Sequence, residues 1–158
     1  MAEKTAALGS KVPDFSLPST SGTSWKPVAA AGRNLVIYFY PRDNTSGCTR
    51  EGLAFRDLYP QFRKAKTEVV GVSTDSLASH GRFRAKYDFP FDLLADEEKV
   101  ACRIFDVIRE KSMYGKKYMG VERSTFLVDA KGVLRREWRK VKVDGHAEEV
   151  LAAARDLK

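Results

Sequence analysis

A cysteine stands where a strand-like segment gives way to a helical one, and this position favours a reactive thiol. Cys48 follows a loop over residues 41–47 and begins an amphipathic pattern of helical spacing. The first N–H groups of a helix have no partners within the helix and carry the positive end of its dipole, so they stabilise a thiolate. Because the thiolate is the nucleophilic form, the position predicts a thiol that reacts near neutral pH.

Four other residues could complete a site in which this thiolate attacks an O–O bond. Charge develops on the leaving oxygen in such a reaction, so a fixed cation is needed, and Arg123 at the start of an apolar segment is the candidate. The hydroxyl of Thr45 could accept from a helix N–H, or bond the thiolate or a peroxide oxygen. Pro41 lacks an N–H and could shield the sulfur from water. Glu51 suits the first helical turn and could hold an arginine.

Each of these residues also has an ordinary structural interpretation. A cysteine at a helix start is often a small buried residue. Thr45 alone would be a helix cap, and Arg123 alone would be a surface residue or a salt-bridge partner. Their joint occurrence at the expected structural places favours the chemical interpretation.

Apolar segments on both sides of the site predict the sheet that must position it. Residues 34–40 and 67–73 are nearly continuous apolar runs, which are typical of strands buried on both faces. Residues 123–129 predict a third such strand, and the turn at 130–132 makes residues 133–138 its hairpin partner.

Helical patterns alternate with these strands. The pattern that begins near Cys48 carries an apolar stripe as far as Phe62, with Pro60 inside it. A second helix, capped by Asp75 or Ser76, is expected to run to about Asp88. A short helix after Asp96 and a last helix from residues 144–145 complete the order. This order predicts an α/β, thioredoxin-like fold, in which helices cover both faces of a mixed central sheet.

Length, composition and charge narrow the protein class. The 158 residues predict a single domain over 1–158, with residues 1–11 flexible. No apolar run is long enough to span a bilayer and no leader precedes the polar N-terminus, so we expect a cytoplasmic protein without membrane contact. The formal charge is +7, but the basic residues are scattered, which favours a solvated surface over nucleic-acid binding.

The motifs around Cys48 and Arg123 resemble those of the peroxiredoxins, specifically of the peroxiredoxin Q or bacterioferritin comigratory protein subfamily. The resemblance runs from about Val12 to the C-terminus. It rests on the pattern Pro41-x3-Thr45-x2-Cys48 and on residues 38–41, 43–51, 55–57, 71–75, 91–96, 123–129 and 145–151.

The resemblance implies that Cys48 is the peroxidatic cysteine and that Pro41, Thr45 and Arg123 complete the peroxide site. It implies reduction of hydrogen peroxide and organic hydroperoxides, with thioredoxin or another thiol as the reductant. It also implies a monomer or weak dimer that uses no metal or organic cofactor.

The sequence departs from the subfamily in its second cysteine. Many members carry a resolving cysteine five residues after the peroxidatic one, where this chain has Leu53, and others carry it in the segment equivalent to residues 76–88, which here holds none. Either an external thiol reduces the sulfenic acid in a one-cysteine cycle, or Cys102 resolves it after local unfolding. Nothing in the sequence around Cys102 indicates an activated thiol, so we favour the first alternative.

Three alternative functions deserve comparison. A thiol–disulfide oxidoreductase is disfavoured because the chain has no CxxC motif. A basic binding module would require one contiguous basic face, and a redox-regulated chaperone or sensor would couple oxidation of Cys48 to assembly. The two histidines, His80 and His146, are interpreted as packing or surface residues rather than as general bases.

Overall fold

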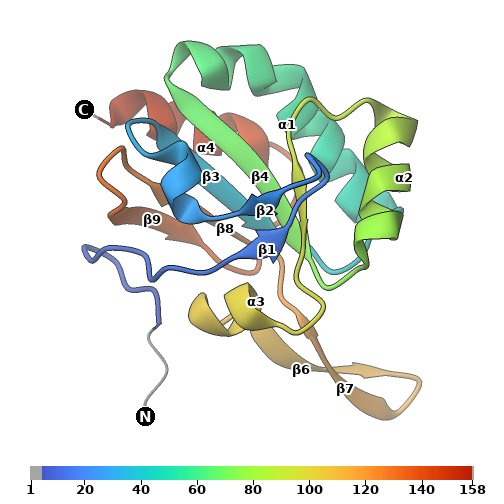
Figure 1. The fold of residues 1–158 in the computed structure, drawn as a ribbon. Coiled ribbons are helices and arrows are strands. Elements are labelled where there is room, and N and C mark those ends of the chain that lie inside the picture. Colours follow the sequence, from blue (N-terminus) through green and yellow to red (C-terminus); the bar gives the residue numbers. More distant parts are fainter. Residues whose placement is uncertain (1–4, 158) are drawn as a thin grey trace.

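The computed structural model describes residues 5–157, and a mixed five-stranded sheet forms its centre (Figure 1). The strands lie in the order β5-β4-β3-β8-β9. Strand β3 is parallel to β4, and β4 to β5, while β8 is antiparallel to both β3 and β9. Their bounds are β3 (Asn34–Phe39), β4 (Thr67–Ser73), β5 (Leu93–Ala95), β8 (Ser124–Val128) and β9 (Leu134–Trp138).

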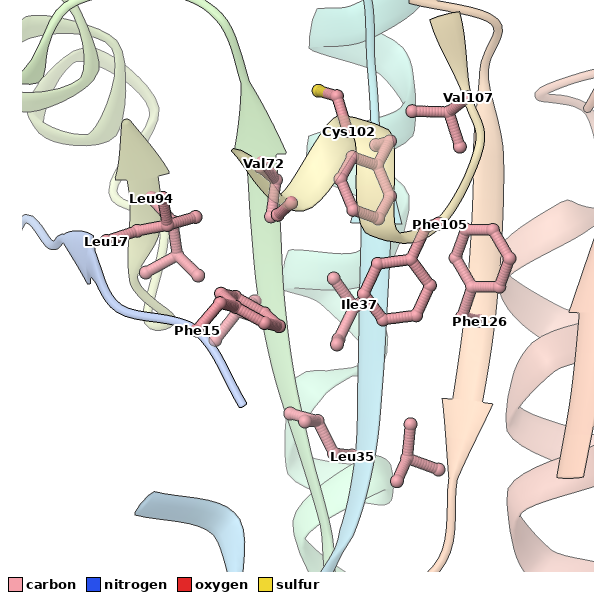
Figure 2. Packing of buried hydrophobic residues seen from close by; sticks show 14 of the residues in the cluster. Phe15, Leu17, Leu35, Ile37, Val72, Leu94, Cys102, Phe105, Val107 and Phe126 are labelled. Atoms are coloured by element: carbon pink, nitrogen blue, oxygen red, sulfur yellow. The ribbon is translucent and has the colours of Figure 1, made fainter. Parts of the chain in front are cut away.

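Two hydrophobic clusters show that both faces of this sheet are covered. Helices α1 (Ser46–Lys64) and α4 (His146–Asp156) pack on one face, together with Phe83 of α2 (Leu77–Tyr87). The other face is covered by α3 (Val100–Ile104) and by the small sheet of β1 (Leu17–Pro18) and β2 (Ser24–Trp25), to which the 3-10 helix η1 (Pro27–Ala30) adds Ala30. Figure 2 shows this second cluster, with Phe105 between Ile37 and Phe126. The predicted thioredoxin-like α/β fold is confirmed.

The cap predicted from the sequence is present at the start of α2. The side chain of Ser76 accepts a hydrogen bond from the backbone N–H of Ser79 at 3.1 Å, as a helix cap does. The helix ends at Tyr87, and the residue after it, Asp88, has a φ of 54°, which lies in the left-handed region. These two ends fix the length of the helix that lies beside β5.

A projecting hairpin, formed by β6 (Ile108–Met113) and β7 (Lys116–Val121), was not predicted from the sequence (Figure 1). Its two-residue turn is Tyr114–Gly115, with φ of 53° and 76°, as a type I′ turn requires. Most of its side chains are exposed or half-buried, so the alternation of apolar and polar residues that marks a half-buried strand is weak here.

The N-terminal segment contacts the rest of the chain. Within the described residues, the backbone N–H of Ala6 donates to the Ile104 carbonyl at 2.8 Å, and that of Val12 donates to the Gly132 carbonyl at 2.9 Å. Flexibility of residues 1–11 stays a prediction, and residues 1–4 lie outside the described part. No helix within residues 5–157 is long and apolar enough to cross a membrane.

Candidate active site

Cys48 and Arg123, the candidate thiol and cation, lie near the ends of two neighbouring strands. Cys48 lies in the first turn of α1, just beyond the loop that leaves β3, and Arg123 directly precedes β8. Phe39 and Ser124 are paired across β3 and β8, so the chain segments that follow one and precede the other meet at the same edge. The Nη2 group of Arg123 donates to Sγ of Cys48 at 3.3 Å, and Cys48 is only 2% exposed.

Glu51 holds the arginine in this position. It lies one helical turn after Cys48, and its Oε1 accepts from Nη1 of Arg123 at 2.6 Å. Burial alone would lower the pKa of Arg123, but the charges of Glu51 and Cys48 raise it above its ordinary value. One guanidinium therefore bridges a buried carboxylate and the sulfur, as the sequence suggested for these three residues.

Burial dominates the ionisation of Glu51. Its side chain is 1% exposed, and Oε2 has no hydrogen-bond partner among the described residues. Burial raises the pKa of Glu51 to about 7, although Arg123 lowers it. The folded state therefore favours the protonated carboxyl of Glu51. The contribution of Glu51 to the free energy of unfolding is fully present below pH 4.5 and is lost as the pH rises through about 7.

Replacing this carboxylate is expected to flatten the dependence of stability on pH. In Glu51→Gln the buried group cannot ionise, so relative to the variant the wild type should lose about 3 kcal/mol of unfolding free energy between pH 4.5 and pH 7. Urea unfolding of both proteins across this range measures the difference. A constant difference between them would show that burial of Glu51 does not control its ionisation.

Thr45 and Pro41 both lie in the loop before α1. Thr45 occupies the N-cap position, but its side chain makes no cap hydrogen bond, and its hydroxyl donates to the Arg42 carbonyl at 3.0 Å. The cap interpretation of Thr45 is therefore wrong, while a bond to a peroxide oxygen stays a prediction. Pro41 is half-buried, and its shielding of the sulfur likewise stays a prediction.

Two residues of the site were missed by the sequence reasoning. A Cβ atom at Gly47 would lie 3.1 Å from Nη2 of Arg123, so the absence of a side chain leaves room for the guanidinium. The amino group of Lys111 donates to the Val121 carbonyl at 2.6 Å, and burial and the charge of Arg123 lower its pKa. Gly47 could have been found from the sequence, because it directly precedes Cys48 in the motif. Lys111 could not, because it lies on the β6–β7 hairpin, which was not predicted.

The second cysteine lies on the other face of the sheet. Cys102 belongs to the cluster that contains α3, whereas Cys48 belongs to the cluster that contains α1. Burial, and then the neighbouring Asp96, raise the pKa of Cys102 well above that of an ordinary thiol, and both cysteines are free. A fully buried thiol with so high a pKa is a poor nucleophile.

Comparisons with known proteins show the family of this chain. The model of the AhpC/TSA family matches residues 8–137. Peroxiredoxin Bcp of Xanthomonas campestris pv. campestris is 54% identical over 140 residues, which cover 89% of this chain and 88% of the relative. Peroxiredoxin Bcp of Bacillus subtilis is 44% identical over 153 residues, which cover 97% of this chain and 98% of the relative.

A solved structure is similar over nearly the whole length. It is that of the Xanthomonas campestris bacterioferritin comigratory protein, which is described for its alkyl peroxide reduction activity. The TM-score is 0.87 at 49% sequence identity, with 96% of this chain and 97% of that chain covered. Fold and sequence are thus both similar to one group of proteins.

Proposed function

Since the chain belongs to the AhpC/TSA family and is a peroxiredoxin of the peroxiredoxin Q and Bcp group, we propose that its peroxidase reaction is carried by the Cys48 thiolate. The observation that carries this proposal is the Arg123 guanidinium, which contacts Sγ of Cys48 at 3.3 Å while Glu51 holds it from the other side. The same cation that favours the thiolate can stabilise the charge that develops on the peroxide.

The oxidation step breaks the O–O bond. The thiolate sulfur attacks one oxygen of the hydroperoxide, forms an S–O bond and loses two electrons, which leaves Cys48 as sulfenic acid. The other oxygen leaves with the electron pair of the broken bond and takes up a proton to become water or an alcohol. Arg123 donates to Sγ of Cys48, and Cys48 lies in the first turn of α1, where the positive end of the helix dipole also favours negative charge.

An external thiol completes the cycle in this proposal. Its sulfur displaces the sulfenic oxygen as water and forms a mixed disulfide with Cys48, and a second thiol of the reductant then releases the Cys48 thiol. Two observations support a one-cysteine cycle: residues 76–88 contain no cysteine, and Cys102 is buried on the opposite face of the sheet. Thioredoxin is the reductant we expect.

Removal of Cys102 is expected to leave turnover within about twofold of wild type, because its thiol takes no part in the one-cysteine cycle. The experiment compares Cys102→Ala with wild type in a coupled peroxidase assay driven by a thioredoxin system. Intact mass is measured after one equivalent of hydrogen peroxide is added to the reduced proteins. A gain of one oxygen supports the one-cysteine cycle, whereas loss of two hydrogens in wild type alone would establish a Cys48–Cys102 disulfide.

The proposal also covers the substrates of the protein, its oligomeric state and its location in the cell. We include organic hydroperoxides as substrates, because the solved Xanthomonas campestris relative is described for alkyl peroxide reduction. A monomer or weak dimer in the cytoplasm, without nucleic-acid or membrane partners, stays a prediction. Peroxide titration of the reduced protein, with hydrogen peroxide and cumene hydroperoxide in parallel, measures the substrate preference.

A further inference from the structure

A fully buried histidine lies beside the loop that carries the reactive cysteine. His80 of α2 is 0% exposed, and the sequence interpretation of it as a surface or packing residue is incomplete. Its Nδ1 lies 2.7 Å from Oδ2 of Asp43, and its Nε2 lies 2.9 Å from the Leu94 carbonyl oxygen. A carbonyl oxygen and a carboxylate only accept, so we assign a proton to both ring nitrogens. The pair is then a buried, charged hydrogen bond.

The carboxylate of Asp43 is surrounded by donors. The Tyr40 hydroxyl donates to Oδ1 at 2.6 Å, and the Ser79 hydroxyl donates to Oδ2 at 2.8 Å. Burial alone would raise the pKa of Asp43, but the hydrogen bonds from His80, Tyr40 and Ser79 lower it. Asp43, Asp75 and His80 have ligand atoms within 4.8 Å of one another, but donors already occupy both oxygens of Asp43. The arrangement is therefore a satisfied hydrogen-bond cluster.

This cluster holds the Cys48 loop, which is the loop over residues 41–47 that precedes Cys48, against α2. Asp43 lies within the loop over residues 41–47, and its backbone N–H also donates to Oδ2 of Asp75 at 2.8 Å. Among the residues that the structure describes, the next loop residue, Asn44, contacts α2 through exposed hydrogen bonds of 3.5 Å to Lys86 and Tyr87. Buried charged hydrogen bonds contribute more than long exposed ones, so the Asp43–His80 pair is the main restraint between this loop and α2.

Regeneration of the cysteine requires that this restraint be released. A reductant sulfur must come within about 2 Å of Sγ to form a disulfide. Cys48 is 2% exposed, and Arg123 contacts its sulfur, so a thiol on another protein cannot reach it in the closed arrangement. The loop and the first turn of α1 must move outward first.

We propose that the Asp43–His80 pair is a latch on the Cys48 loop, and that its opening sets the rate at which an external thiol reduces oxidised Cys48. This inference rests on the proposed one-cysteine cycle. His80 is a positioning residue in it, because it acts on the sulfur only through Asp43 and the loop. The chemistry is unchanged: the reductant thiol forms a bond to sulfur, the oxygen leaves as water, and the second reductant thiol supplies the remaining electrons.

Two amide replacements of His80 separate its two hydrogen bonds. The side-chain nitrogen of asparagine stands near the place of Nδ1, so His80→Asn can still donate to Asp43 and loses the Leu94 contact. The nitrogen of glutamine reaches the place of Nε2, so His80→Gln keeps the Leu94 contact and loses Asp43. Each variant loses one contact of the ring, and the thermal stability of both is measured beside the rates. Ser79→Ala, which removes one donor to the same carboxylate, is a milder unlatching variant.

The assay measures the two half-reactions separately. Reduced protein is oxidised with one equivalent of hydrogen peroxide, and the sulfenic acid is then mixed with dithiothreitol or with a reduced thioredoxin. We expect the ratio of the reduction rate constant to the oxidation rate constant to rise about tenfold in His80→Gln, and less in Ser79→Ala. In His80→Asn the ratio should stay near that of wild type. The same unlatching should lower the fraction of protein that excess peroxide converts to sulfinic acid.

The outcomes distinguish the latch from the reaction it regulates. Equal ratios in His80→Gln and His80→Asn would show that His80 has a purely structural role, and would overturn the latch proposal. If His80→Gln does not fold, an unchanged ratio in Ser79→Ala overturns the proposal equally. A wild-type protein that forms no sulfenic acid at all would instead overturn the proposed function.

Discussion

Peroxide consumption is expected to fall by roughly 10⁴-fold or more in Cys48→Ser, a loss on the scale seen when an enzyme loses its nucleophile. The serine hydroxyl is almost wholly un-ionised near neutral pH, and neither Arg123 at 3.3 Å nor the start of α1 can supply the missing nucleophile. The measurement is a single-turnover titration, in which peroxide loss and intact mass are followed together.

The matched control is Cys102→Ala, which removes the other thiol of the chain and should consume peroxide at the wild-type rate. Serine is close to cysteine in size, so circular dichroism should show the same fold in Cys48→Ser and wild type. Peroxide left untouched by wild type as well would mean that Cys48 is not peroxidatic, and a binding function would then have to be tested.

Loss of the arginine should have the second-largest effect. In Arg123→Met the guanidinium no longer donates to Sγ of Cys48, and we expect the second-order rate constant with hydrogen peroxide to fall by about 10²- to 10³-fold. Stopped-flow measurement of peroxide consumption by the pre-reduced protein gives this constant. Arg123→Lys retains the charge, but it has no planar fork with which to reach both Cys48 and Glu51. Its rate constant should therefore lie between those of Arg123→Met and wild type.

Removal of this arginine also leaves Glu51 buried without its partner, which costs about 3–5 kcal/mol of stability if the carboxylate stays charged. The double variant Arg123→Met with Glu51→Gln removes that charge and keeps the rate measurement on folded protein. Arg135→Met, which breaks an exposed ion pair with Asp129, is the control for loss of a positive charge elsewhere. A double variant as fast as this control would exclude electrostatic assistance by Arg123.

Much of the fold could be predicted because its central strands carry strong local signals. The apolar runs of β3 and β4 and the turn before β9 are visible in the sequence, and the predicted boundaries lie within a residue or so of the observed ones. The β6–β7 hairpin could not be predicted in this way. Its side chains are largely exposed, and its turn begins with Tyr114, a residue that the sequence does not mark as a turn former.

The sequence by itself determined the α/β order of the elements and the place of Cys48 at the start of a helix. It also marked Arg123, at the start of a strand, as the partner of that cysteine. These follow from local periodicity and from residue types at fixed spacing, which need no knowledge of distant contacts. Only the tertiary structure decided that Cys102 is separated from Cys48 by the sheet. It also decided that His80 meets Asp43 across 37 positions of sequence, because burial and hydrogen-bond partners arise only once the elements pack.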